Sequence, residues 1–473
     1  MSDLVGRKRE IGILQDALKS NKPELIAVYG RRRIGKTFLI REVYKKYIVF
    51  DYSGIHNESL SGQLKNFRLI LSDKNVRVKK PADWIEAFHA LGQFIDQITS
   101  KQKKVIFIDE FPWLDTRKSK FLPAFDNFWN NYASKKNDLI VVICGSAASY
   151  MINNILRSKG GLHNRITNKI HLCPFNLYET EMLLRKNKVI LTRYDILQIY
   201  MAMGGVPYYL EKIIPGESVA QCIDRLCFDK NGPLRSEFSN VFASLFSVHE
   251  NHEAILRNLA SVRKGLTRNA ILEITKIASG GTLTKTLVEL EESGFIEKYT
   301  PYKGIKDPLY RLTDEYTLFY IRFIERTKPS ANGVWDKLYN QQPYKIWSGL
   351  CYETVCIKHI AQLKEGLKIS GIHSEQGSWI EKKTKNGAQV DLLIDRDDNV
   401  INLCEIKFYN TKFTIDKSYA QEIMIKLNAF SEGTKTNKSI FVTFITTYGL
   451  VSNQYSRQVV QNELTMDHLF IDL

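Results

Sequence analysis

The sequence predicts an α/β protein built around a parallel sheet, and three stretches carry that prediction. Each is a short apolar run that ends in small or polar residues: LIAVYG at 25–30, VIFIDE at 105–110 and LIVVICGS at 139–146. Continuous apolar runs of this length are typical of strands that are buried on both faces of a parallel sheet. Further strand signals at 47–52 and 169–173, and a helical stripe over 84–98, extend the pattern, whereas 55–80 is polar with weak periodicity. We therefore expect strands that alternate with helices.

The loop after the first run carries the most specific chemistry. Residues 30–37 read GRRRIGKT, and apolar residues then recur at helical spacing from Phe38 to Val43. A strand, a G-x-x-x-x-G-K-[ST] loop and a helix form the pattern of a phosphate-binding loop. Gly30 and Gly35 let the backbone N–H groups turn toward phosphate oxygens, and the helix presents its positive end to the same anion.

We expect this loop to bind ATP together with Mg²⁺. Lys36 can reach the β- and γ-phosphates, and the Thr37 hydroxyl can ligate Mg²⁺. The segment at 5–14, VGRKREIGIL, is either a plain N-terminal helix or one that closes over the adenine. The predicted nucleotide contacts are Gly30, Arg31, Arg32, Arg33, Ile34, Gly35, Lys36, Thr37, Phe38 and Ser146.

Polar residues at the ends of the later strands complete the expected catalytic site. The second run delivers Asp109 and Glu110 to the carboxyl end of its strand, where ligands of open α/β sheets bind. Asp109 is expected to hold the Mg²⁺ shell, and Glu110 to orient and polarise the attacking water. Ser146 is either a γ-phosphate or water contact or a helix N-cap. Arg165 is either an arginine finger toward a neighbouring subunit's ATP or a surface residue.

These motifs, with IDEFPWLD at 108–115, CGSA at 144–147 and GGVPYYL at 204–210, resemble those of the archaeal-type ATPases. That family belongs to the AAA-like P-loop NTPases, close to the STAND group, and the resemblance covers about residues 1–320. It implies a parallel sheet of strand order 5-1-4-3-2 in an ATPase core at 1–175. It also implies a helical lid at 176–240 and MgATP held by Lys36, Thr37, Asp109 and Glu110.

Residues 241–328 are expected to form a winged helix. Three helices are predicted at 255–262, 268–277 and 283–293, followed by a two-stranded wing. The third helix would present Thr282, Thr284, Lys285 and Thr286 on its exposed face, as a recognition helix in a major groove does. The alternative is a module that only packs or contacts proteins.

A second site is expected in residues 329–473, after a linker at 329–333. Glu353 lies in a predicted helix, and Asp391, Glu405 and Lys407 lie on two predicted strands at 388–395 and 400–408. A spacing of two places Glu405 and Lys407 on one face, and a hairpin would set Asp391 beside Glu405. Two carboxylates and a lysine suit a Mg²⁺-bound phosphodiester. Asp391, Glu405 and Glu353 would bind the metal, and Lys407 would steady or activate the attacking water.

This arrangement resembles the PD-(D/E)XK nuclease superfamily, with Val390 in the place of the proline. The resemblance implies a restriction-endonuclease-like α/β domain and DNA cleavage. The alternatives are an inactive relic of such a domain and an ion pair across a hairpin.

The net charge and the lengths of the apolar runs indicate the class of partner and the location of the protein. The net charge of +16 favours an anionic partner, most simply DNA, although a generally basic proteome would give the same charge. No apolar run approaches the ~20 residues that span a bilayer, and the start is unlike a signal peptide, so a cytoplasmic protein is expected.

The leading hypothesis is an ATPase coupled to a DNA-acting C-terminal domain, in a homo-oligomer if Arg165 is a finger. The rival is a STAND-type ATP-dependent switch whose C-terminal domain is inactive and serves only for contacts. A transposon- or phage-related DNA enzyme is not separated from these by the sequence.

Overall fold

The computed structural model describes residues 4–74, 79–100, 102–157, 162, 164–246, 248–278, 280–302, 307–328, 333–339, 341–380 and 389–473. The chain divides into two compact units, residues 1–174 and 175–473, and each is described by itself. Of the linker predicted at 329–333, only Gly333 lies within the described residues. The finer division of the second unit into lid, winged helix and nuclease-like domain stays a prediction.

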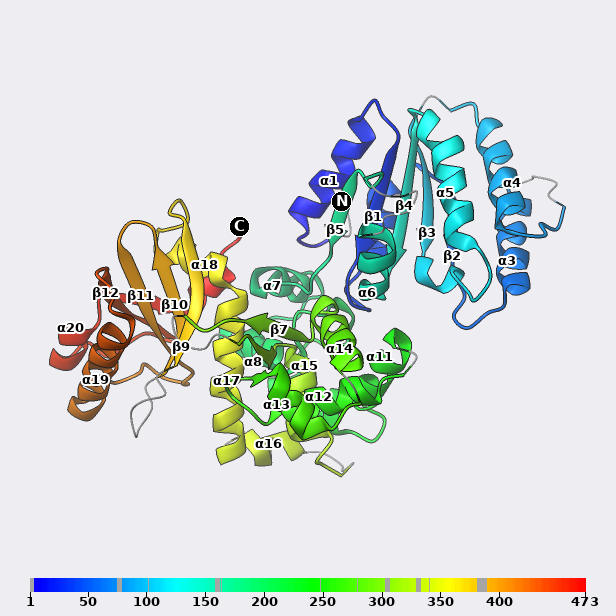
Figure 1. Ribbon diagram of the computed structural model, residues 1–473. Coiled ribbons are helices and arrows are strands. Elements are labelled where there is room, and N and C mark those ends of the chain that lie inside the picture. Colours follow the sequence, from blue (N-terminus) through cyan, green and yellow to red (C-terminus); the bar gives the residue numbers. More distant parts are fainter. Residues whose placement is uncertain are drawn as a thin grey trace. The chain divides into compact units, whose positions relative to one another are not determined.

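The first unit is an α/β structure around a five-stranded parallel sheet (Figure 1). The strand order is β2-β3-β4-β1-β5, which confirms the predicted order read from the opposite edge. The strands are β1 (Glu24–Tyr29), β2 (Ile48–Ser53), β3 (Lys104–Asp109), β4 (Leu139–Gly145) and β5 (Asn168–His171).

Alternate residues of the buried strands face two separate cores. In β1, Leu25 and Ala27 join the core under helices α3 (Leu60–Ser72), α4 (Trp84–Asp96) and α5 (Phe121–Asn131), whereas Ile26 and Val28 join the core under α1 (Lys8–Lys19) and α2 (Lys36–Tyr44). The sequence did not predict helix α3, because the apolar periodicity of residues 55–80 is weak. The buried face of α3 consists of Leu64, Phe67 and Leu71 together with the polar Gln63. The helices are α1 (Lys8–Lys19), α2 (Lys36–Tyr44), α3 (Leu60–Ser72), α4 (Trp84–Asp96), η1 (Phe111–Leu114), α5 (Phe121–Asn131), η2 (Ala133–Lys135), α6 (Ala148–Tyr150) and η3 (Met151–Leu156).

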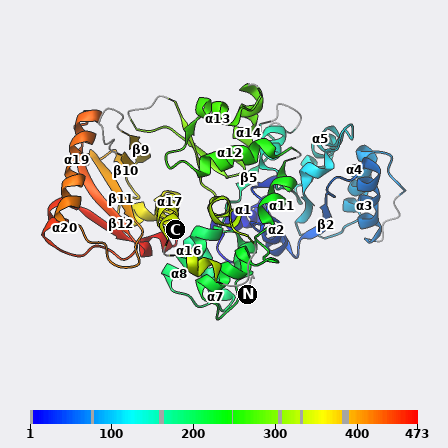
Figure 2. The same ribbon diagram turned by 90° about the horizontal axis from the view of Figure 1, so that it is seen from below.

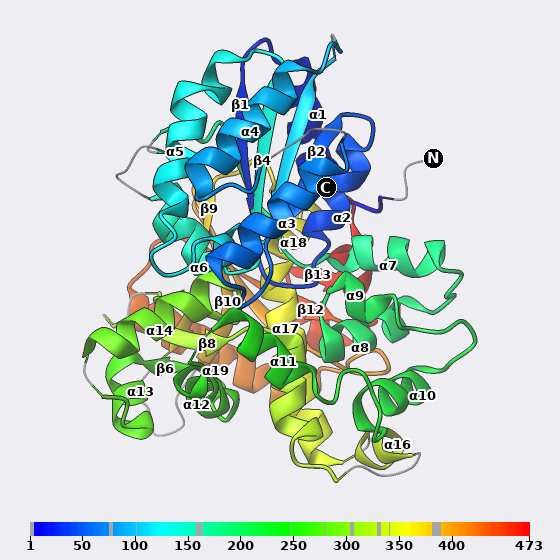
Figure 3. The same cartoon turned by 90° about the vertical axis from the view of Figure 1, so that its right-hand side faces the viewer.

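The second unit begins with helices and continues into a small sheet. Its first helices are α7 (Leu177–Lys186), α8 (Arg193–Met203), α9 (Pro207–Leu210), α10 (Val219–Ile223), η4 (Asp224–Phe228) and α11 (Glu237–Leu245). Next come α12 (Glu250–Ala260), β6 (Leu266–Thr267), α13 (Arg268–Thr275), α14 (Gly280–Glu292), β7 (Ile296–Tyr299) and β8 (Leu309–Leu312). The three strands form an antiparallel sheet of order β6-β8-β7 beside α12, α13 and α14 (Figure 3).

The prediction of the exposed face of α14 is wrong at one residue. Thr282, Thr284 and Lys285 are exposed, but Thr286 is buried with 4% of its surface accessible. Its hydroxyl donates to the Thr282 carbonyl at 3.0 Å. The helix buries Leu283, Leu287 and Leu290, and Thr286 lies close enough to that stripe to be covered with it.

The C-terminal part of the second unit is a mixed five-stranded sheet of order β13-β12-β11-β10-β9 (Figure 2). Helix α17 packs against β11 from one side, and α19 and α20 cover β12 from the other. The strands are β9 (Ser374–Ile380), β10 (Gln389–Arg396), β11 (Val400–Lys407), β12 (Ser439–Thr446) and β13 (Asn462–Thr465). The helices are α15 (Glu315–Phe319), η5 (Tyr320–Ile324), α16 (Val334–Tyr339), α17 (Gln342–Lys358), α18 (Ile360–Gly366), α19 (Lys417–Thr434), α20 (Gln454–Val459) and η6 (Met466–Phe470).

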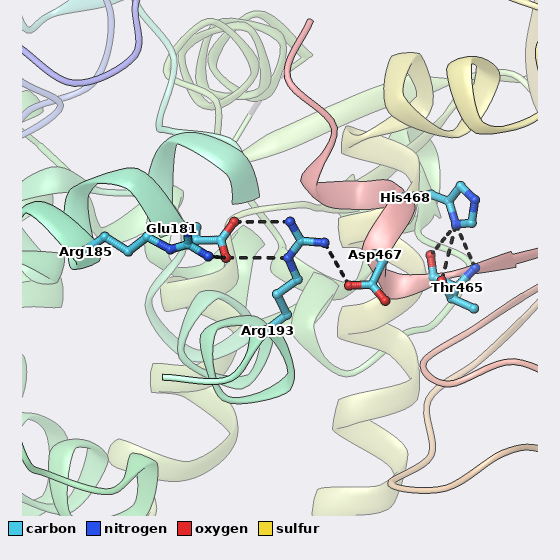
Figure 4. A network of polar contacts seen from close by, with 6 residues as sticks. All are labelled: Glu181, Arg185, Arg193, Thr465, Asp467 and His468. Atoms are coloured by element: carbon cyan, nitrogen blue, oxygen red, sulfur yellow. Dashed lines mark hydrogen bonds and ion pairs between the residues drawn. The ribbon is translucent and has the colours of Figure 1, made fainter. Parts of the chain in front are cut away.

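Arg193 ties the end of the chain to the first helices of this unit (Figure 4). Its guanidinium donates to Asp467 of η6 at 2.9 Å and lies 3.4 Å from Glu181 of α7, which also accepts from Arg185. The Thr465 hydroxyl and the His468 ring close the first turn of η6. Among the described residues, no helix is both long and apolar enough to cross a membrane.

A buried histidine joins α17 to the start of α7. His359 is 1% accessible; its Nδ1 contacts the Val355 carbonyl at 2.8 Å, and its Nε2 accepts from the Leu177 N–H at 3.0 Å. Both contacts are satisfied by the neutral ring with the proton on Nδ1. Burial lowers the pKa of His359 to about 4.

We expect the second unit to lose stability as the pH falls from about 6.5 to 4. The folded protein holds His359 in its neutral form, whereas the unfolded chain protonates this histidine below about pH 6.5. Protonation of the unfolded chain therefore lowers the free energy of unfolding as the pH falls, by up to about 3 kcal/mol near pH 4. Denaturant unfolding at both pH values measures this loss. His359→Gln keeps a donor and an acceptor but does not titrate, so its loss over the same range should be smaller. An equal loss in both proteins would contradict this assignment.

Candidate functional site

The loop between β1 and α2 is folded around the side chain of Lys36. The Lys36 ammonium donates to the carbonyls of Gly30 at 2.9 Å and Arg31 at 2.8 Å, at the start of its own loop. Only 6% of Lys36 is accessible. The loop backbone is therefore held in a tight curve by the residue that is expected to contact the phosphates.

Glycine is required at Gly30 by a neighbouring strand. Its φ of 140° lies in a region that side chains disfavour, and a Cβ there would lie 2.2 Å from the Leu172 carbonyl oxygen. Gly35 has φ 86° at the N-cap of α2, and a Cβ there would meet nothing within 4 Å. Gly30 is thus fixed by packing, whereas Gly35 keeps its Cβ position open at the helix N-terminus, where an anion would approach.

Thr37 and Asp109 meet across the top of the sheet. The Thr37 hydroxyl donates to the Asp109 carboxylate at 2.6 Å, although Thr37 lies in α2, after β1, and Asp109 ends β3, with β4 between the two strands. The second Asp109 oxygen accepts from the Glu110 N–H at 2.9 Å. The two residues predicted to hold the metal shell are thus in direct contact.

Glu110 is held by Ser146. The Ser146 hydroxyl lies 2.5 and 2.6 Å from the two carboxylate oxygens, and the Ser146 N–H donates at 3.3 Å. Glu110 itself has φ 46°, a left-handed conformation that is uncommon for such a residue. Helix α6 begins two residues later with Ala147 as its N-cap, so the interpretation of Ser146 as an N-cap is wrong.

The electrostatics of the loop favour an anion. Burial lowers the pKa of the Lys36 ammonium, and nearby groups that include Glu110 and Asp109 offset part of this effect. A buried cation of this kind is stabilised when an anion binds beside it.

The remaining predicted contacts are placed less centrally. Arg31 and Ile34 are buried, Arg32 and Arg33 are half-buried, and Phe38 is 49% accessible. Arg165 is exposed in a turn before β5, and the described residues give its side chain no hydrogen bond or ion pair. Sequence reasoning missed Arg7, which donates to the Ile34 carbonyl at 3.3 Å. Its position between a glycine and the first helix is the one signal that could have revealed it.

In the second unit, the four residues predicted for a second site come together. The β10–β11 register pairs Leu392 with Cys404, so its next step sets Asp391 opposite Glu405. Lys407 lies 3.7 Å from Glu405. Glu353 of α17 belongs to the same cluster, because one guanidinium, that of Arg263, contacts both Glu353 and Asp391. Burial and the Asp391 carboxylate raise the pKa of Glu353 to about 8.

Cations already contact each of these carboxylates. Arg263, which follows α12, donates to Glu353 at 2.5 Å and to Asp391 at 2.9 Å. Glu405, 4% accessible, pairs with Lys426 and accepts from the Tyr419 hydroxyl at 3.2 Å. No signal in the sequence pointed to Arg263, because it lies 90 residues before Glu353 and 128 before Asp391.

This pairing changes what the acidic cluster can hold. Within the described ranges, no three histidine, cysteine, aspartate or glutamate side chains lie in a group that could bind a metal ion. The arrangement expected for Asp391, Glu405 and Glu353 as one ligand set is therefore absent here. Arg263 pairs with Glu353 and Asp391, and both Lys426 and Lys407 pair with Glu405.

Residues 4–213 match the family described as an ATPase domain predominantly from Archaea. The matched range contains the phosphate loop, the Asp109–Glu110 pair and Ser146, and it covers less than half of the chain. Together with the sheet order, the match identifies the N-terminal part of the chain as a P-loop ATPase domain.

Similarity to two known proteins extends over more of the chain than that range, and a third is similar over a short segment. An uncharacterized protein of Methanocaldococcus jannaschii is 25% identical over 417 residues, which are 86% of this chain and 88% of that protein. An uncharacterized ATP-binding protein of the same organism is 50% identical over 38 residues, which are 8% of this chain and 64% of that protein. A Walker-type ATPase of Pyrococcus abyssi has a TM-score of 0.50 at 15% identity, over 68% of this chain and 97% of its own. At this identity the likeness shows a shared fold.

The close approach of Leu172 to Gly30 gives a paired test. Gly30→Ala should destabilise the first unit by more than about 2 kcal/mol, because the Cβ clashes with a backbone oxygen. Gly12→Ala, in helix α1 with nothing within 4 Å of its Cβ, should stabilise it by about 0.5–1 kcal/mol. Calorimetric melting of the full chain measures both. Equal melting temperatures for the two variants would contradict the described packing.

Proposed function

We propose that this chain hydrolyses ATP at the phosphate loop and uses the nucleotide cycle to control a DNA-acting site in its second unit. The observation that supports the first part is the contact of Thr37 with Asp109 at 2.6 Å beside the buried Lys36. These are the side chains that hold Mg²⁺ and the terminal phosphates in P-loop enzymes.

The oxygen donors fit Mg²⁺. Octahedral Mg²⁺ holds its ligands at about 2.0–2.1 Å, so neighbouring ligand oxygens lie about 2.9 Å apart. The Thr37 and Asp109 oxygens are already near that separation, and a small shift would accommodate the ion directly or through water. Mg²⁺ bound there would neutralise charge on the β- and γ-phosphates.

Glu110 is the proposed base and water-positioning residue. Ser146 donates to its carboxylate, which fixes the orientation of the group. Arg165 is proposed to reach the nucleotide of a neighbouring copy in a homo-oligomer, for which its exposure is suitable.

Glu110→Gln should retain ATP binding and lower the rate of phosphate release at least about 100-fold, because the amide cannot accept a proton. Lys36→Ala should lose binding and hydrolysis together. Calorimetric titration with ATP and a phosphate-release assay separate the two effects. Hydrolysis by Glu110→Gln at the wild-type rate would remove Glu110 from this role.

The second unit is proposed to act on DNA through a winged helix and a Mg²⁺-dependent nuclease-like domain. The order α12-β6-α13-α14-β7-β8 supports the winged helix, with Thr282, Thr284 and Lys285 exposed on α14. A helix before a β9-β10-β11 hairpin, with Asp391 opposite Glu405 and Lys407 beside it, supports the nuclease-like domain. The net charge of +16 agrees with a nucleic-acid partner.

One observation favours the rival function. Arg263, Lys426 and Lys407 pair with the three acids, so the cluster is stable without a metal ion. In that case the C-terminal domain would only make contacts, and the chain would be an ATP-dependent switch. For cleavage, Mg²⁺ has to compete with Arg263 for Glu353 and Asp391.

Mg²⁺-dependent cleavage of labelled DNA distinguishes the two functions. Asp391→Asn should abolish cleavage, and Arg263→Gln should lower the Mg²⁺ concentration that gives half of the maximal rate, because the competing cation is gone. Glu422→Gln, which removes one negative charge as Asp391→Asn does but at an exposed position of α19, serves as the control for that variant. If neither the wild-type chain nor Arg263→Gln cleaves DNA, the switch is the better account.

A further inference from the structure

A groove beside the acidic cluster has the chemistry of a polynucleotide site. It has a volume of about 670 Å³ and lies among α8, η5, α16, α17 and the end of β11. Arg263, Glu353 and Lys407 are among its lining residues, so the groove borders the cluster described above. All of these elements belong to the second unit.

The groove is strongly cationic. Four basic side chains line it, namely Arg263, Arg322, Lys345 and Lys407, and Glu353 is the single carboxylate among the described lining residues. No hydrogen bond or ion pair of the Arg322 or Lys345 side chain is found within the described part of the chain. Burial and the neighbouring Arg326 lower the pKa of the half-buried Arg322. Cations in this situation are stabilised by an anion that enters the groove.

Aromatic rings alternate with these charges. Tyr194 stacks on Phe408 with ring centroids 5.5 Å apart, and Tyr339 packs on Tyr344 at 4.6 Å. Tyr409, 49% accessible, lies at the rim. Cations that follow a phosphate backbone and aromatic faces that stack on bases are the two features of single-strand binding sites.

The size of the groove favours a single strand over a duplex. A cavity of this volume encloses a molecule of drug size, which corresponds to about two nucleotides. A duplex would have to remain outside it. Gly349 contributes to this space, because a Cβ on it would meet nothing within 4 Å although the residue lies inside helix α17.

We propose that this groove binds a single polynucleotide strand and guides its phosphates toward the Asp391–Glu405 cluster. The direction of the strand toward the cluster rests on the proposed DNA-acting function, whereas the binding itself does not. The phosphates contact Arg322, Lys345 and Lys407, and the bases stack on the accessible rings of Tyr194, Tyr339 and Tyr409 rather than on the buried Tyr344.

The test is fluorescence anisotropy of a labelled oligodeoxythymidylate of about 12 nucleotides with the full chain in EDTA. Lys345→Gln and Gly349→Leu should each weaken binding about tenfold or more, the first by removing a phosphate contact and the second by filling the groove. Lys345→Gln should also reduce the salt dependence, with the slope of log K against log salt shallower by about 0.7. A duplex of the same length should bind more weakly than the single strand.

Two matched controls accompany these variants. Gly349→Ala adds one methyl group that meets no neighbour, and Lys230→Gln removes an equal charge from an exposed turn outside the groove. Both should bind like the wild type. Wild-type affinity in Lys345→Gln and Gly349→Leu, or a preference for the duplex, would overturn the proposal. Competition by thymidine monophosphate at the affinity of the oligonucleotide would also overturn it, because the site would then take a free nucleotide.

The readout separates this inference from the proposed function. Binding in EDTA needs neither metal nor cleavage. If the groove variants lose binding while the wild-type chain fails to cleave DNA in Mg²⁺, the groove stands and the nuclease proposal fails. If cleavage occurs while the groove variants bind normally, the groove alone is overturned.

Discussion

The contact between the Thr37 hydroxyl and the Asp109 carboxylate is the constraint on which the nucleotide site depends. It joins the helix after β1 to the end of β3, with β4 between the two strands. Strands lie about 4.8 Å apart, so the contact spans roughly 10 Å of sheet, and only the loop that projects over β4 can close that distance. Lys36 holds the same loop through the Gly30 and Arg31 carbonyls. The phosphate loop and the Asp109 carboxylate are therefore fixed by contacts of two adjacent residues, Lys36 and Thr37.

The second unit contains a cluster of carboxylates that needs neutralising cations. Three carboxylates converge where a helix crosses a sheet, and such a group is costly unless cations neutralise it. In this structure the neutralising groups are Arg263, Lys426 and Lys407. Arg263 lies between the acids and the basic groove, so the same side chain would have to move for a metal ion and would face an incoming phosphate. If the proposed metal ion and strand bind here, both would therefore depend on the position of the segment after α12 that carries Arg263.

Local motifs predicted the first unit well, and long-range pairing limited the prediction of the second site. The apolar runs located all five strands of the first sheet, and the G-x-x-x-x-G-K-[ST] spacing with the Asp109–Glu110 pair located the residues around the loop. The register that sets Asp391 opposite Glu405 followed from hairpin spacing. Arg263 could not be predicted, because its partners lie far along the chain and no periodic pattern connects them. The burial of Thr286 and the contact of Ser146 with Glu110 likewise depend on packing that a local pattern does not encode.

The central claim is that Thr37 and Asp109 jointly hold the metal ion of a bound nucleotide. Electron paramagnetic resonance of Mn²⁺, used in place of Mg²⁺, measures this directly in the presence of ATP. The account predicts a bound Mn²⁺ signal that requires ATP and an affinity that falls about 10–100-fold in both Thr37→Val and Asp109→Asn. Wild-type Mn²⁺ affinity in both variants, with ATP still bound, would contradict it.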